Sequence, residues 1–133
     1  MKHTIPLAPW SYGKIIEGKK KIQPAILDKK AQQVRINDEI EFENIATKEK
    51  ITCLVNGMVI FEHFNLMIDS LPAELFGYDD ALEVKVRIER MFSAEEMENN
   101  FAVGFFIAPI VQSIQKVRSA NFNFERVPEN GRD

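Results

Sequence analysis

The sequence has little of what metal and redox sites are built from. Its 133 residues include one cysteine, Cys53, and two histidines, His3 and His63, which lie far apart in the chain. A zinc site needs three or four clustered Cys or His ligands, and a disulfide needs two cysteines. We therefore expect no metal site, no cofactor and no disulfide. Cys53 lies inside the apolar run ITCLVNGMVIF and is interpreted as a buried thiol.

Long apolar runs and glycine-rich loops are also missing. No stretch approaches the roughly 18 apolar residues of a membrane span, and the opening MKHTIPLAPW lacks the apolar block of a signal peptide. The expectation is a cytoplasmic protein without a membrane partner. The glycines stand alone rather than in a phosphate-binding loop, so Gly57, Gly77 and Gly104 are interpreted as turn, cap or packing residues.

The composition is that of a globular protein. Hydrophobic residues make up 45% of the chain and charged residues 28%, which excludes a disordered or fibrous protein. The length fits one domain with a core large enough to fold without disulfides or metal. We find no internal repeat or low-complexity segment.

Charge is distributed unevenly along the chain. The segment from Lys14 to Arg35 holds seven cations and two carboxylates, a local charge of +5 in a chain whose net charge is -3. The remainder carries -8, which disfavours indiscriminate duplex binding but permits a focused site for a phosphate or a short strand. A solvated lysine-rich surface explains the same charges, and both interpretations stay open.

Hydrophobic periodicity predicts the elements of the first half. The segment PWSYGKIIEG predicts a short helix with Ser11 as its N-cap and Gly18 as its left-handed C-cap. Alternation over residues 34–43 predicts a half-exposed strand with a turn at Asn37-Asp38. Residues 51–60 are a continuous apolar run in which Gly57 marks a bulge, so two antiparallel strands are expected.

Helical spacing appears in the second half. Residues 61–71 predict a helix that Pro72 and Gly77 end, whereas residues 82–88 fit either a helix capped by Asp79 or Asp80, or a strand. The sequence SAEE at 93–96 is a capping box, and NNFAVGFFIAPI reads as a buried strand. Residues 111–127 predict a final strand or helix.

The order of these segments resembles the bacterial branch of the ASCH domain family, which is related to PUA domains. The short helix, the lysine-rich turn, RINDEIEFEN, FEHFNLMIDSLPAELFGY and MFSAEEMENNFAVGFFI follow the family order over residues 4–107. The resemblance implies an α+β fold, a small and mostly antiparallel PUA-like β-barrel flanked by short helices, with a cleft beside the first helix. Residues 1–110 would form this domain, and residues 111–133 a C-terminal extension and mobile tail.

The family signature G-x-K-x-x-E-x-R is half present. Gly18 and Lys20 match, whereas Gln23 stands in place of the glutamate and Ala25 in place of the arginine. Asn37 and Phe92 likewise replace a glycine and a tyrosine. Some bacterial members resembling this chain remove an acyl group from a modified cytidine with a lysine as base, which makes Lys20 a candidate catalytic residue. Gln23 cannot transfer a proton at neutral pH, so the sequence leaves an enzyme open but favours a binding module.

Aromatic side chains beside the lysines support binding. Trp10 and Tyr12 flank the helix that delivers Lys20, and an aromatic ring beside a cation can stack a base while its phosphate is neutralised. The predicted ligand site comprises Trp10, Tyr12, Lys20, Lys21 and Gln23, and the expected partner is RNA or a nucleotide-like small molecule. The alternative interpretation of Trp10 is a packing residue that seals the helix against the barrel. The alternative functions are an amidohydrolase and a protein-interaction domain that uses the C-terminal extension; oligomeric state stays open.

Overall fold

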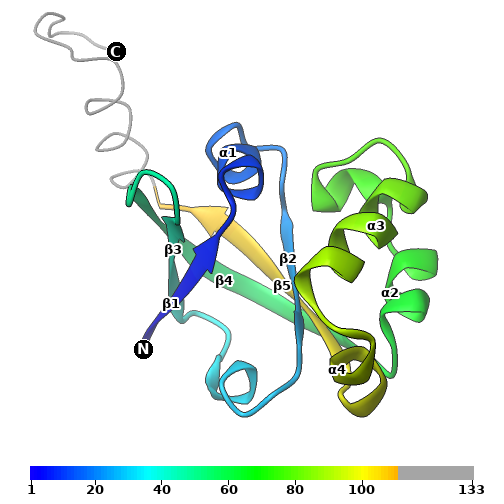
Figure 1. Ribbon diagram of the computed structural model, residues 1–133. Coiled ribbons are helices and arrows are strands. Elements are labelled where there is room, and N and C mark those ends of the chain that lie inside the picture. The colour runs from blue at the N-terminus through cyan, green and yellow to red at the C-terminus, as the bar shows by residue number, and fades with distance from the viewer. Residues whose placement is uncertain (111–133) are drawn as a thin grey trace, which may run out of the picture.

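Residues 1–110 are described by a computed structural model (Figure 1). The interpretations of residues 111–133 as an extension, a tail or an interaction segment lie outside the described residues. The elements, in chain order, are β1 (Lys2–Leu7), α1 (Pro9–Ile16), β2 (Ile22–Ile26), the 3₁₀ turn η1 (Ala31–Gln33), β3 (Glu39–Asn44), β4 (Lys50–Phe61), α2 (Phe64–Ser70), the 3₁₀ turn η2 (Ala73–Phe76), α3 (Ala81–Met91), α4 (Ala94–Asn99) and β5 (Ala102–Pro109).

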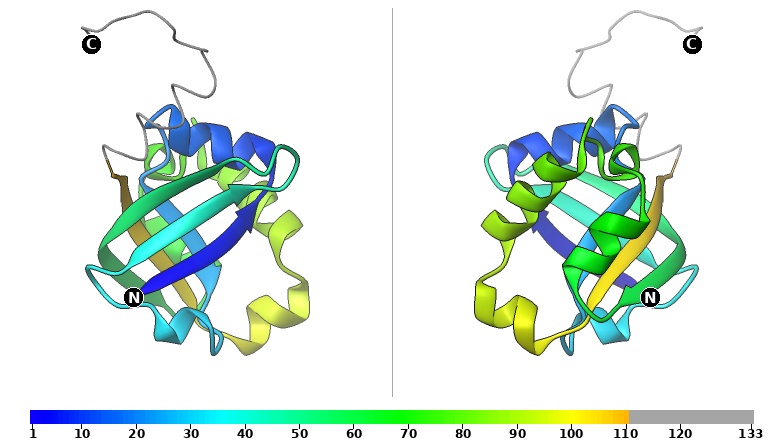
Figure 2. Two further views of the ribbon diagram at one scale, coloured as in Figure 1. Left: turned by 90° about the vertical axis from the view of Figure 1, so that its left-hand side faces the viewer. Right: turned by 90° about the vertical axis from the view of Figure 1, so that its right-hand side faces the viewer.

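The five strands form one curled sheet in the order β1-β3-β4-β5-β2. The β1–β3 pair is parallel and the other three pairs are antiparallel. The sheet curls into a half-barrel whose end strands are β1 and β2, while α1 crosses one end and the remaining helices gather beside β2 and β5 (Figures 1 and 2). The predicted α+β, mostly antiparallel PUA-like architecture is confirmed.

The sheet separates two hydrophobic cores, because alternate residues of a strand point to opposite faces. One core fills the half-barrel and includes Ile15 of α1, Phe42 of β3 and Phe105 of β5. The other lies between the sheet and the helices and includes Ile22 of β2 and Met67 of α2. Strand β2 contributes to both cores, since Ala25 packs inside the half-barrel and Ile22 under the helices.

Gly104 allows close packing at the helical face. It lies opposite Pro24 in the β2–β5 ladder, and a Cβ added to it would be 3.1 Å from Ile22 Cγ2 and 3.3 Å from Val59 Cγ1. The interpretation of Gly104 as a packing glycine is therefore confirmed. Gly57 marks the irregularity between β4 and β5 that the sequence predicts.

Asp38 fastens β1 to the turn before β3. Its carboxylate Oδ2 lies 2.8 Å from His3 Nε2 and accepts the amide hydrogen of Arg35 at 2.9 Å. The hydrogen bond from His3 and then that from the Arg35 amide hold the pKa of Asp38 well below its usual range. The neighbouring Asn37 has a left-handed φ of 76°, which asparagine tolerates better than most residues and which explains why it can replace a glycine.

Several local predictions are confirmed. Gly18 follows α1 with a φ of 75°, and the Ser93–Glu96 capping box is formed. Residues 81–91 are a helix rather than a strand, and the side chain of Asp80 caps it. Cys53 is fully buried, and burial raises the pKa of its thiol to about 12. No helix within residues 1–110 is long and apolar enough to cross a membrane.

Other local predictions are wrong. Ser11 is not an N-cap, because α1 begins earlier, at Pro9, and its N-cap Ala8 makes no side-chain hydrogen bond. Ile36 does not join the apolar face of β3, since the strand begins only at Glu39 and Ile36 remains 53% exposed. The sequence also gave no sign of β1, whose side chains alternate in burial although its apolar residues are few.

We predict that Gly104→Ala destabilises the protein by about 1–3 kcal/mol, because the fully buried Ile22 leaves the new methyl group no room. Gly13→Ala is the matched control, since Gly13 lies within α1 and has no atom near the position of a Cβ. The control should gain about 0.5–1 kcal/mol from helix propensity. Urea unfolding measures the free energy of unfolding of both variants. A Gly104→Ala protein as stable as the wild type would contradict the packing assignment.

We predict that Asp38 makes stability depend on pH on the acid side. Because its pKa is lower in the folded state, its contribution is fully present above the ordinary value of 3.8 and is lost as the pH falls below that value. The thermal unfolding midpoints of the wild type and Asp38→Asn should therefore differ most at neutral pH and become equal in acid. A difference between the two midpoints that stays constant between about pH 7 and pH 3 would contradict this assignment.

Candidate functional site

Lys20 is buried where α1 turns into β2. The helix ends at Ile16 and Gly18 turns the chain, and the amides of Lys19 and Lys20 both donate to the carbonyl of Lys14, at 2.9 and 3.1 Å. This turn directs the Lys20 side chain back against α1, where its Nζ donates to Ser11 Oγ at 2.6 Å. Lys20 is 4% exposed and Ser11 2%. By contrast, Lys19 is exposed and pairs with Glu17, as expected for the solvated lysine-rich surface.

Burial changes the chemistry of Lys20. Removal of water from the ammonium lowers the pKa of Lys20 to about 7, so neutral and charged forms coexist near neutral pH. No carboxylate among residues 1–110 forms an ion pair with it. Gln23, at the signature's glutamate position, is also buried, but its amide nitrogen donates to the Pro24 carbonyl at 3.2 Å. The arrangement therefore offers a lysine able to accept or donate a proton, without an anionic partner.

A narrow cavity links Lys20 to the helices. It has a volume of about 10 Å³, and its lining includes Trp10 of α1, Pro24 of β2 and Arg87 of α3. Room of this size holds a single water at most, so a larger ligand must bind at its outer rim.

The Lys21 amide donates to the Leu75 carbonyl at 2.8 Å, which ties this end of β2 to the turn η2.

Aromatic rings and cations surround the rim of this cavity. The Arg87 guanidinium lies 4.4 Å from the centroid of the Trp10 ring and 5.8 Å from that of Tyr78. Lys14 Nζ lies 5.4 Å from the Tyr78 centroid, and the two rings are 6.1 Å apart. Burial raises the pKa of Tyr78 to about 12; among the smaller influences, Arg87 lowers this pKa and Glu83 raises it. We call Trp10, Lys14, Tyr78 and Arg87 the aromatic-cation cluster.

The sequence-based site missed Tyr78 and Arg87, which reach α1 only through the packing of α3. A signal was nevertheless available. Val84, Arg87 and Ile88 recur at helical spacing, and Arg87 therefore falls on the apolar stripe of α3 rather than on its solvated face. An arginine on such a stripe is a candidate for a contact with another element.

The five predicted ligand residues lie in three places. Trp10 and Lys20 line the same narrow cavity. Gln23 is opposite Phe105 in the ladder and Tyr12 belongs to the half-barrel core, so both are buried inside it. The hydroxyl of Tyr12 and Oε1 of Gln23 have no hydrogen-bond partner among residues 1–110. Burial, with smaller effects of Glu49 and Cys53, raises the pKa of Tyr12 to about 12. Lys21 is exposed and lines a separate groove, with Phe106 and Pro109 of β5.

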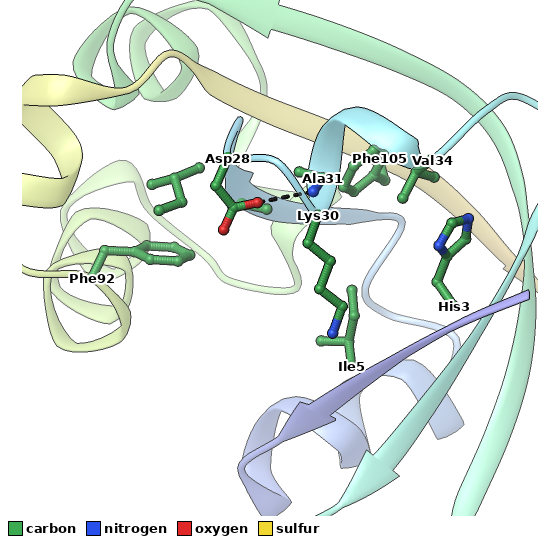
Figure 3. Close-up of a pocket in the computed structure, with 10 residues that line it drawn as sticks. His3, Ile5, Asp28, Lys30, Ala31, Val34, Phe92 and Phe105 are labelled. Atoms are coloured by element: carbon green, nitrogen blue, oxygen red, sulfur yellow. Dashed lines mark hydrogen bonds between the residues drawn. The ribbon is translucent and has the colours of Figure 1, made fainter.

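A second cavity, of about 100 Å³, opens between the end strands β1 and β2. Figure 3 shows it, with Ile5, Phe92 and Phe105 among its apolar walls and Lys30 extending toward β1. Lys30 Nζ donates to the Thr4 carbonyl at 2.8 Å, and Asp28 Oδ1 accepts the Ala31 amide at 2.9 Å. Both charged side chains therefore have partners within the protein. This cavity suits a small apolar group.

Ala25 forms part of the wall of this second cavity. The family signature has arginine there, so a position that would carry a guanidinium is apolar in this chain. The second cavity therefore lacks the cation that the signature implies, and it is distinct from the cavity that Lys20 lines.

Within residues 1–110, no group of three or more His, Cys, Asp or Glu side chains is arranged to hold a metal ion. His63 has a structural role: its Nδ1 accepts the Asn65 amide at 3.1 Å and caps α2. Its side chain is 34% exposed and lies 3.5 Å from Glu98 Oε1. His63 is thus a partly exposed residue whose imidazole caps a helix.

Comparison with known proteins identifies relatives by structure. No protein-family model and no curated protein sequence matches the chain. The crystal structure of the hypothetical protein PH0355 superposes with a TM-score of 0.73 at 25% identity, covering 83% of this chain and all of that one. ASCH from Zymomonas mobilis gives a TM-score of 0.56 at 15% identity and covers 92% of this chain and 80% of its own.

The ASCH domain from Lactobacillus crispatus gives a TM-score of 0.58 at 13% identity, covering 81% of this chain and 79% of its own. Identities this low carry information about the fold rather than about residue roles. The chain thus shares its overall fold with two ASCH structures from different bacteria. The chain therefore has the ASCH-domain fold that the order of its sequence motifs predicts.

Proposed function

We propose that this chain is an ASCH-type binding module for RNA or a nucleotide-like ligand, and that the ligand binds beside α1. The aromatic-cation cluster is the observation that carries the proposal. It places two half-buried rings and two cations around a cavity that also contains the buried Lys20. Rings that stack bases beside cations that neutralise phosphates are the combination found in single-strand recognition.

The charge of the rest of the molecule supports a localised site. The chain has a net charge of -3, and the excess of cations lies between Lys14 and Arg35. An acidic protein repels nucleic acid except where its cations gather, so binding would concentrate around α1 and the turn that follows it. Because the cavity itself holds no more than a water, a base would stack on the accessible parts of the Trp10 and Tyr78 rings.

We predict that Trp10→Ala weakens binding of short single-stranded RNA by about tenfold or more, since stacking contributes about 1–3 kcal/mol per base. Phe101→Ala is the matched control, because Phe101 is an aromatic residue 53% exposed just before β5 and outside the cluster. Fluorescence anisotropy at low salt, with RNAs and free nucleosides as ligands, measures the affinities. Absence of binding to every ligand would reject the proposal, and affinity independent of salt would remove its electrostatic part.

Deacylation of a modified nucleoside is the second candidate, favoured by one observation. Lys20, the signature lysine, has a pKa of about 7 and contacts the Ser11 hydroxyl at 2.6 Å. A neutral lysine can take a proton from a hydroxyl or a water, which is the role that the family resemblance implies. Two features oppose this candidate. Both side chains are buried, which limits the access of a substrate to them, and Gln23 provides no acid or base.

We predict for this candidate that release of cytidine from an acylated cytidine increases with pH through about 7, because the base must first lose its proton. Lys20→Met should reduce the rate by about a hundredfold or more, while Lys19→Met should not change it. Chromatography of free cytidine measures the rate. Equal rates in wild type and Lys20→Met would exclude Lys20 as the base.

A further inference from the structure

Arg87 is held between aromatic rings on the inner side of α3. Its neighbours on the same stripe, Val84 and Ile88, are each 2% exposed, so the arginine side chain leaves the helix where it packs rather than where it is solvated. The guanidinium lies over Trp10 at 4.4 Å and near Tyr78 at 5.8 Å.

The donors of Arg87 are not satisfied within the described part of the chain. Its Nε is buried and has no hydrogen-bond partner, and none of the ion pairs of residues 1–110 includes it. A buried donor without a partner costs about 1–3 kcal/mol, and more when charged. Glu83 lies one turn earlier on the same helix, yet it does not come within ion-pair distance. The rings thus hold a guanidinium that has no acceptor among residues 1–110.

The charges around Arg87 favour an anion. Lys14 of α1 lies over the ring of Tyr78, and Lys20 lines the same cavity as Arg87. Glu83 is the carboxylate that influences the pKa of Tyr78, and it acts against the nearby charge of Arg87. The guanidinium that the family signature places at residue 25 is absent, whereas Arg87 brings one to Lys20 from a different element.

We propose that Arg87 binds an anionic phosphoryl group of the ligand on the helical face of β2, the face opposite that of Ala25. Two N–H groups on one edge of a guanidinium match two phosphoryl oxygens, a geometry that a lysine cannot reproduce. The inference rests on the proposed function for the location of the ligand. It adds that the ligand is recognised as a phosphate ester, a nucleotide or an RNA strand, rather than as a free nucleoside.

The test compares cytidine, cytidine monophosphate, inorganic phosphate and a short single-stranded RNA as ligands of the full chain. We expect the NMR signal of the Arg87 Nε–H to shift with the three phosphate-containing ligands and not with cytidine. Arg87→Lys should bind cytidine monophosphate at least about tenfold more weakly, with its affinity for cytidine unchanged. Arg90→Lys, an exposed arginine in the last turn of α3, is the matched control and should behave as wild type.

The outcomes separate this inference from the proposed function. If RNA binds but the Arg87 signal does not move and Arg87→Lys binds equally well, the phosphate role is overturned and the binding module stands. If inorganic phosphate moves the signal but RNA and both cytidine compounds fail to bind, the module is overturned and the phosphate site stands. If no ligand binds, both are overturned. Should Arg87→Lys fail to fold, the Nε–H signal of the wild-type protein still decides.

Discussion

The burial of both faces of β2 is the constraint on which the rest of the structure depends. Ile22 packs under the helices while Ala25 faces the half-barrel, so the strand cannot slip or twist without disturbing two cores. Its start is fixed by the turn after α1, and Gly104 on β5 leaves space for Ile22. Because this strand follows directly from Lys20, the lysine is held buried against Ser11 instead of reaching solvent as its neighbours do.

The helical layer that covers β2 also determines the character of the site. α3 brings Arg87 to Trp10, and the turn before it brings Tyr78 to Lys14. Neither Arg87 nor Lys14 has a carboxylate partner among residues 1–110, which leaves a cationic and aromatic surface on an acidic molecule. A fold would ordinarily pair or solvate such groups, and unpaired donors concentrated in one place are typical of a surface that receives an anion.

Local signals predicted much of the fold and part of the site. Gly18, the SAEE capping box and the Gly57 bulge act within a few residues, so their effect is readable from the chain alone. β1 was missed because its pairing with β3 depends on residues more than thirty positions away, including the contact of His3 with Asp38. Ser11 was misplaced for a different and local reason, since Pro9 starts the helix earlier and leaves the serine inside it.

By itself, the sequence determined the periodic elements, the position of Lys20 just after a helix stop, and the order of motifs that resembles ASCH domains. Each of these follows from side-chain chemistry over short separations. Only the tertiary structure decided that Lys20 is desolvated while Lys21 is exposed, that Gln23 and Ala25 face the half-barrel, and that Arg87 stands beside Trp10. Burial and the meeting of α1 with α3 are properties of packing between distant segments, which short-range patterns do not encode.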